Sequence, residues 1–372
     1  EIAQCLVGSE MCIRDRLYYK STKTIKCFTK VLGVAAMVSM KDISAACGVS
    51  IATVSKALND HNDIGSETKQ HIKQVAKEMG YLPNSAAKAL KTNRTYNIGV
   101  LFSDDNHSGL THDYFAFVLD SFKSTAERKG YDITFINVSR SKDRRMSYLE
   151  HSRYRGFDGV AVVCVNFYDP EVEELVRSEI PVITVDHVFN NRISIVSDNV
   201  KGMRDLLTYI YKQGHREIAY IHGVDSSVTR NRLSSFYHTA EELGLYVPDE
   251  YVLEAPYRDA AAARIMTEKL LDLRTPPTCI CYPDDFSAFG GMNAIMERGL
   301  KIPEDVSVAG YDGIRAGMHI EPQLTTVKQD TARLGRCAAE KLISLIERPK
   351  STIIEQVVVE GKVLEGRSVG KR

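Results

Sequence analysis

The sequence predicts two kinds of structure in one chain: an all-α helix-turn-helix headpiece, and an α/β core of two lobes, each built on a doubly wound parallel sheet. Two observations support this prediction. Residues 43–79 carry helical hydrophobic spacing interrupted by glycine, whereas from residue 97 onward short apolar runs alternate with amphipathic segments. The chain has 372 residues, which is enough for two or three domains with a sizeable core.

The headpiece is predicted from two short helical segments that meet at Gly48. Residues 43–47 and 51–59 each place apolar side chains on one face. Gly48 lies where a tight turn between helices needs a residue without Cβ strain, and Ser50 stands at the N-cap of the second helix. This spacing is typical of a helix-turn-helix, whose second helix enters the major groove of DNA. An ordinary helical hairpin has the same pattern and stays open as the alternative from these residues alone.

A third helix and a short hinge complete the predicted headpiece. We expect the helix over residues 66–79, with Ser66 as its cap and Gly80 after its end. Its apolar face can close the first two helices into a three-helix domain. After Pro83, residues 85–90 form a helical turn that is too short and too poor in apolar residues to fold alone.

The core is predicted from two consecutive series of buried strands and helices. Strand-like runs cover residues 97–102, 131–138, 159–165 and 181–187 in the first series, and 216–223, 278–283 and 306–312 in the second. Helical segments cover 114–129, 170–178, 234–243, 260–271 and 287–298. Two such series imply two doubly wound sheets with a cleft between them, where ligands bind beyond the carboxyl ends of the strands.

Composition excludes several other classes. Lys+Arg and Asp+Glu both number 48, so the whole chain is not a basic nucleic-acid binder, although residues 37–94 hold eight basic and five acidic side chains. The eight cysteines lack zinc-site spacing, so we expect no metal, no cofactor and a reducing, cytoplasmic location. No run of 18 apolar residues predicts a membrane span. Phosphate-loop, nucleophile-elbow and zinc-protease motifs are absent, so we expect no catalytic residues and no enzyme.

Residues 1–36 are set apart from the fold prediction. They resemble non-native sequence read upstream of a gene fragment, or an upstream extension, and a weak signal peptide is the less favoured alternative. We expect the folded protein to begin at Met37 or Met40, and both starts stay open.

Eight segments match one known family in order. They are GVSIATVSKALN, YLPNSAAKAL, TYNIGVLFSD, IPVITVDH, SDNVKG, QGHREIAYIHG, PDDFSAFGGMNAI and VSVAGYDGIRAGMHIEPQLTTVKQD. With the region around Arg232, the resemblance covers about residues 40–365. In these segments the chain resembles the lactose-repressor/galactose-repressor (LacI/GalR) family of bacterial transcription regulators. The resemblance implies a homodimer on a palindromic double-stranded DNA operator, and a periplasmic-binding-protein-like core that binds a small effector.

The resemblance also implies domain boundaries. The headpiece is expected over 37–82, the hinge and linker over 83–96, and the core over 97–372, with one lobe at about 97–188 and 329–352 and the other at about 189–328 and 353–368. The chain would cross between the lobes three times. LTTVKQD would be one crossing, and IIEQVVVEG would return the chain to the second lobe.

DNA contacts in the headpiece are implied by the same resemblance. Ser50 and Thr53 are expected on phosphates, Ser55 on a base or phosphate, Asn59 and Tyr81 on the DNA backbone, and Ile51, Ala52 and Lys56 at the positions that vary with operator sequence. Because Ile51 and Ala52 can meet only thymine methyl groups, we expect Lys56 to be the main polar reader, with guanine as its partner.

Hinge contacts follow in the same way. The resemblance makes Leu90 a wedge that enters the minor groove and kinks the operator, in a hinge that also holds Asn84, Ala87 and Lys88. Leu90 packing on the core is the alternative.

The effector site is predicted at strand ends. Three predicted strands end at Ser103–Asp105, at Asp284–Asp285 and at Asp312. The predicted strand over 216–223 leads into a loop that holds Arg232. Carboxylates and a guanidinium that converge on one cleft suit a polyhydroxylated ligand. We expect Asp285 to cap the helix that follows it. The resemblance assigns effector contacts to Asp104, Arg232, Asp284 and Asp312, with Phe115 and Tyr257 as flanking aromatic rings, although residues 105–113 depart from the family's usual turn.

These observations predict a sequence-specific repressor whose operator affinity is changed by a small effector, which we expect to be a sugar. A monosaccharide, disaccharide, sugar acid or nucleobase stays open, and so does the sign of the response, with release of DNA on ligand binding favoured. A periplasmic solute-binding protein is the rival class, because it would share the core but lack the headpiece.

Overall fold

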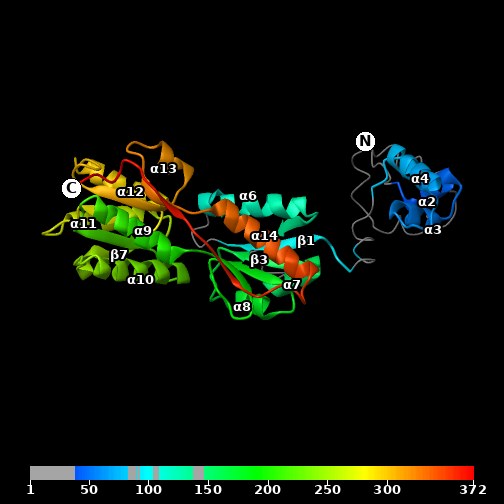
Figure 1. Ribbon diagram of the computed structural model, residues 1–372, viewed down its shortest axis with the longest axis horizontal. Coiled ribbons are helices and arrows are strands. Elements are labelled where there is room, and N and C mark those ends of the chain that lie inside the picture. The colour runs from blue at the N-terminus through cyan, green and yellow to red at the C-terminus, as the bar shows by residue number, and fades with distance from the viewer. Residues whose placement is uncertain (1–37, 83–88, 90–92, 104–108, 137–145) are drawn as a thin grey trace, which may run out of the picture. The chain divides into compact units, whose positions relative to one another are not determined.

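The computed structural model describes residues 38–82, 89, 93–103, 109–136 and 146–372. It divides into two compact units, Glu1–Lys91 and Thr92–Arg372 (Figure 1). The extension at residues 1–36 and the hinge positions Asn84, Ala87, Lys88 and Leu90 lie outside the described residues. We take the two units in turn.

The first unit contains three helices around one small core. They are α2 (Met40–Cys47), α3 (Ile51–Leu58) and α4 (Ser66–Glu78). Each helix contributes to a buried cluster made of Ile43, Val54, Ala57, Ile72 and Ala76. The predicted three-helix headpiece is therefore confirmed.

Local chemistry sets the helix ends in this unit. Gly48 ends α2 with a φ of +66°, a conformation that glycine adopts without Cβ strain. The Ser50 side chain accepts a hydrogen bond from the Thr53 backbone N–H and so caps α3, as expected. The expected cap of the third helix was wrong: Gly65 is the N-cap of α4 and Ser66 is its first helical residue.

The first lobe of the second unit is a three-layer structure. Its strands are β1 (Asn97–Phe102), β2 (Asp132–Phe135), β3 (Gly159–Val163), β4 (Val182–Val185), β5 (Ile193–Ser197) and β11 (Gln356–Val359), in the order β11-β5-β4-β3-β1-β2, all parallel. Its helices are α6 (Asp113–Arg128), α7 (Tyr148–Arg155), α8 (Pro170–Arg177) and α14 (Thr331–Glu347), with a 3-10 turn at Gly109–Thr111. The predicted doubly wound sheet is confirmed.

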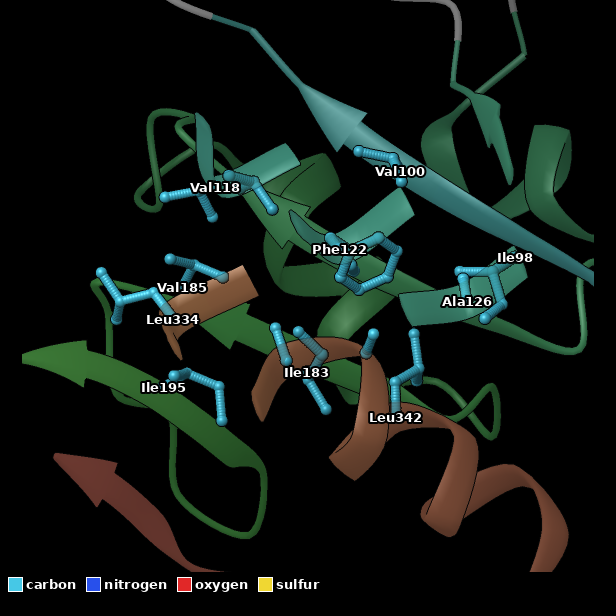
Figure 2. Close-up of a cluster of buried hydrophobic side chains, with 14 of the residues drawn as sticks. Ile98, Val100, Val118, Phe122, Ala126, Ile183, Val185, Ile195, Leu334 and Leu342 are labelled. Atoms are coloured by element: carbon cyan, nitrogen blue, oxygen red, sulfur yellow. The ribbon is translucent and has the colours of Figure 1, made fainter. Parts of the chain in front are cut away.

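Alternating side chains bury both faces of this sheet. Figure 2 shows Ile98 and Val100 of β1 and Ile183 of β4 on the face covered by α6 and α14, where Phe122 is enclosed. Leu101, the next residue of β1, faces the opposite side and packs against a cluster that includes residues of α7 and α8. Burying each of these large apolar side chains stabilises the lobe by about 1.5–3 kcal/mol.

The second lobe repeats this architecture. Its strands are β6 (Ile218–His222), β7 (Val252–Glu254), β8 (Cys279–Cys281), β9 (Ser307–Asp312), β10 (Thr325–Lys328) and β12 (Lys362–Leu364), in the order β12-β10-β9-β8-β6-β7, with β12 antiparallel. Its helices are α9 (Asn199–Lys212), α10 (Ser227–Glu242), α11 (Ala260–Leu271), α12 (Asp285–Glu297) and α13 (Arg315–His319), with a 3-10 turn at Asp249–Tyr251. One buried cluster lies beneath α9 and α10 and another beneath α11 and α12.

Two of the expected lobe boundaries were wrong. β5 and β11 both belong to the first sheet, where Gln356–Val359 pairs in parallel with Ser194–Ser197. The chain therefore passes between the lobes after β5, after β10 and after β11. The QVVV run does not return to the second lobe, because its backbone extends the first sheet, and only β12 joins the second.

Candidate functional site

The exposed surface of α3 carries the side chains expected to read DNA. Ile51 is 49% exposed and Ala52 is also exposed, so both are accessible to a partner. The Ser50 and Thr53 hydroxyls lie 2.8 Å apart at the start of the helix. An exposed isoleucine beside two hydroxyls and the free N–H groups of a helix start suits a surface that meets both base methyls and phosphates.

Lys56 is engaged with a residue that the sequence reasoning missed. Its Nζ donates a hydrogen bond to the Asp63 carboxylate, and both side chains are about half exposed. This hydrogen bond lowers the pKa of Asp63. The Asn59 amide donates to the Ser55 backbone oxygen at 2.6 Å, so it closes the last turn of α3. Tyr81 packs, partly buried, against the headpiece core.

A cavity of about 600 Å³ lies between the two lobes of the core. Five of the six expected effector residues line it: Phe115, Arg232, Tyr257, Asp284 and Asp312. The sixth, Asp104, lies outside the described residues. Ser103 follows β1, Cys164 follows β3 and Asp312 ends β9, so the cavity stands at the carboxyl ends of the strands. The cavity lies where the strand ends predicted a site, and effector binding by these residues stays a prediction.

Arg232 is a buried cation in the wall of the cavity. It lies on α10, which begins at Ser227, so the expected loop at this position was wrong. Its Nε donates to Asn199 Oδ1 at 2.7 Å and its Nη1 to the Pro283 carbonyl at 2.8 Å. Its guanidinium lies 3.5 Å from the centre of the Tyr311 ring. Nη2 has no hydrogen-bond partner among the described residues and can donate to a ligand.

Asp312 is the carboxyl group least occupied by protein contacts in this cavity. It accepts one hydrogen bond, from Gln329 Nε2 at 2.6 Å, which leaves its second oxygen for a ligand. Burial raises the pKa of Asp312 to about 7, although the nearby Arg232 acts in the opposite direction. The Gln329 side-chain oxygen is buried without a partner in the described structure and lines the same cavity.

The cap role expected for Asp285 falls to Asp284, which also lines the cavity as expected. Asp284 is the N-cap of α12: it accepts hydrogen bonds from the Ser287 N–H and hydroxyl, and from the Arg258 backbone N–H. Asp285 is not a cap but a fully buried residue that accepts from the Ile314 N–H and the Thr326 hydroxyl. β8 ends at Cys281 and α12 begins at Asp285, both two residues earlier than expected, so the N-cap is Asp284. Burial raises the pKa of both carboxyl groups.

Aromatic rings form the rest of the wall. The Tyr257 hydroxyl lies 2.8 Å from Thr229 Oγ1, and burial raises its pKa. Phe115 packs edge-on against Phe102 and Tyr114.

Several cavity residues were missed by the sequence reasoning. Asp186 accepts from the Tyr114 hydroxyl at 2.9 Å and from the Ser197 N–H at 3.1 Å. His187 stacks on Phe167 with ring centres 4.4 Å apart. Asp186 and His187 directly follow β4, so the strand-end rule that found Asp312 could have found them.

Two negative observations limit the chemistry of the described part of the chain. Within residues 38–82, 89, 93–103, 109–136 and 146–372, no three His, Cys, Asp or Glu side chains gather where they could hold a metal ion. In the same ranges, no helix has the length and apolar character needed to cross a membrane.

A three-helix reader of DNA and a two-lobed core with a polar cavity define a class: bacterial transcription regulators built on a periplasmic-binding-type core. Family models agree, since "Bacterial regulatory proteins, lacI family" matches residues 39–84 and "Periplasmic binding protein-like domain" matches 207–369. The chain belongs to the LacI family, whose members are DNA-binding transcriptional repressors.

Curated relatives extend over almost the whole chain. The HTH-type transcriptional repressor PurR of Serratia proteamaculans is 31% identical over 90% of this chain and 97% of its own length. The probable HTH-type transcriptional repressor ExuR of Bacillus subtilis is 30% identical over 85% and 93%, respectively. The Lac repressor dimer bound to operator and the anti-inducer ONPF has the same fold, with 23% identity, a TM-score of 0.77, and coverage of 90% of this chain and 100% of that chain.

Proposed function

We propose that this repressor binds a palindromic operator as a homodimer in the cytoplasm, and that a sugar in the interlobe cavity changes its affinity for that operator. The observation that carries the proposal is that Arg232 and Asp312 both line one cavity of about 600 Å³. Each has a polar atom that no described protein group occupies. The proposal needs no metal, no cofactor and no catalysis.

A sugar suits the cavity because its hydroxyl groups both donate and accept hydrogen bonds. The open oxygens of Asp312 and Gln329 can accept from hydroxyl groups, and Nη2 of Arg232 can donate to a sugar oxygen. The Phe115 and Tyr257 rings supply apolar surface for the C–H faces of a sugar ring. A cavity of this size accommodates a monosaccharide or a small disaccharide.

On the DNA side, we propose that α3 reads the major groove. Ser50 and Thr53 suit phosphate contacts, Ile51 and Ala52 suit thymine methyl groups, and Lys56 suits guanine once it leaves Asp63. Exchange of this surface ion pair costs little, because water screens both exposed charges. The proposed minor-groove wedge at Leu90 rests on sequence resemblance.

The two-lobed core offers a way to couple the effector cavity to operator binding by α3. A ligand that contacts both lobes favours one arrangement of the lobes, and the three chain crossings allow that arrangement to change. A differential contact of this kind changes operator affinity by ~1–3 kcal/mol. For a sugar we expect release of the operator.

The test is a thermal-shift screen of the full chain against neutral hexoses, disaccharides, hexose acids and nucleobases. We expect a sugar or sugar derivative to raise Tm, and Arg232→Gln to abolish that rise while operator affinity without ligand is kept. Stabilisation by nucleobases alone would overturn the sugar proposal. An inability of the full chain to enrich any sequence from a random duplex library would favour a solute-binding protein instead.

A further inference from the structure

The second arginine of the cavity, Arg258, has only long side-chain contacts among the described residues: its guanidinium lies 5.0 Å from the centre of the Phe286 ring and forms one ion pair. Its side chain is 11% exposed, and its Nε is buried without a hydrogen-bond partner in the described structure. Its one ion-pair contact is long, at 3.5 Å from Nη1 to Asp113 Oδ2 across the two lobes, and the Asp113 side chain is 49% exposed. A buried guanidinium with so little compensation carries a cost that a ligand can relieve.

Arg258 and Arg232 are anchored on the same short segment. Arg232 Nη1 donates to the Pro283 carbonyl, and the Arg258 backbone N–H donates to the Asp284 carboxylate. Both arginines line the cavity. The loop after β8 therefore helps to position two arginines in the wall of the cavity, each with N–H donors that have no hydrogen-bond partner among the described residues.

Apart from the half-exposed Asp113, the carboxyl groups near these donors are already occupied by protein hydrogen bonds. Asp284 accepts three hydrogen bonds, and Asp186 accepts one on each of its oxygens. Among the described residues that line the cavity, Asp312 and Gln329 keep open side-chain oxygens, and these suit hydroxyl groups. The unmet requirement beside the arginines is thus for an acceptor with negative charge, and a carboxylate matches a guanidinium through paired N–H···O bonds.

From this imbalance between free donors and occupied acceptors we infer that the effector is a sugar acid whose carboxylate is bound by Arg258, together with Arg232. The inference rests on the proposed function, since it names the class of sugar within the same cavity. Asp312 and Gln329 then take hydroxyl groups of the ligand. The neighbouring carboxyl groups of Asp186 and Asp284 are engaged by protein hydrogen bonds, and burial raises the pKa of both, as it does for Asp312.

The test is calorimetric titration of the full chain with glucuronate, galacturonate and gluconate, and with the matched neutral sugars glucose and galactose. We expect at least one acid to bind about tenfold or more tightly than its neutral match, because a charged hydrogen-bond pair is lost in the latter. Arg258→Gln should remove this preference. The matched control is Arg264→Gln: Arg264 is an arginine of the same lobe that pairs with Glu268 and Glu297 away from the cavity, and its replacement should keep the preference.

Three outcomes overturn the inference. Neutral sugars that bind as tightly as the acids would show that no carboxylate is recognised, although the proposal of a sugar effector would stand. An acid preference that survives in Arg258→Gln would assign the carboxylate to another group. Binding by none of the five compounds would exclude hexose acids, and the proposed function would then fall only if the wider sugar screen also gave no stabilisation.

Discussion

Replacing Asp312 by asparagine is expected to stabilise the ligand-free protein and, at the same time, to weaken its response to the effector. The carboxyl group is held in the wall of the cavity with one hydrogen bond, from Gln329. Asparagine keeps an oxygen for that bond and has the same shape, but it carries no charge. The substitution therefore removes the cost of an ionised carboxylate in a poorly solvated place.

The magnitude follows from the pKa of Asp312, which burial raises from 3.8 to about 7. Between these pH values the folded state binds more protons at this site than the unfolded state, so the free energy of unfolding of the wild type falls as pH rises through this window. The full difference of about three pKa units corresponds to ~4 kcal/mol. Because Asp312 keeps some solvent exposure, we expect Asp312→Asn to gain about 1–4 kcal/mol at pH 8.

The assay is thermal unfolding of both proteins at pH 4, 6 and 8, followed by circular dichroism. The Tm of the variant should exceed that of the wild type at pH 8, by about 2 °C or more for each kcal/mol, and the two should converge near pH 4. Asp225→Asn removes an exposed carboxylate of the same lobe and is the control for the loss of one negative charge. A variant with a lower Tm than the wild type at pH 8, or with the same Tm difference from the wild type at pH 4, 6 and 8, would refute the electrostatic explanation.

Three further changes test other parts of the protein. Lys56→Ala should cost ~1–3 kcal/mol of discrimination between cognate and altered operators; an equal loss on all duplexes would show a phosphate contact only. Ile72→Ala should destabilise the headpiece by about 2–5 kcal/mol, seen as loss of DNA binding with the core intact, because Ile72 is fully buried. Gly223→Ala should weaken effector binding and spare DNA binding, since a Cβ there would lie 2.0 Å from the Tyr257 ring; unchanged effector affinity would show that the ring is not needed.

Local patterns predicted those elements whose partners are close in sequence. β1 spans Asn97–Phe102 and α11 spans Ala260–Leu271, the ranges that apolar run and helical spacing indicated. The Ser50 cap follows from a serine before a helical pattern. The placement of β5 and β11 in the first sheet could not be found in this way, because their pairing joins residues about 160 positions apart. Such pairing depends on which sheet edge is available in the folded lobe, not on local sequence.

The candidate site also has some features that the sequence predicts and others that it does not. Strand ends located Asp312 and Asp284 correctly in the cavity, since all parallel strands end on one side of a sheet. Which of Asp284 and Asp285 becomes the cap depends on where the chain turns after β8, and adjacent identical residues carry no signal for that choice. The pairing of Lys56 with Asp63, and of Arg258 with Asp113 in the opposite lobe, depends on how separate elements pack. Periodicity within one element contains no information on either contact.

The coupling of cavity to operator can be measured directly by fluorescence anisotropy of a labelled duplex, selected from a random library with the full chain. Wild type and Arg232→Gln would be titrated onto it with and without the ligand found in the thermal screen. We predict that ligand changes the duplex affinity of the wild type about 5- to 150-fold, and leaves that of Arg232→Gln unchanged. A ligand that binds the wild-type cavity but leaves its duplex affinity unaltered would contradict control of DNA binding by this site.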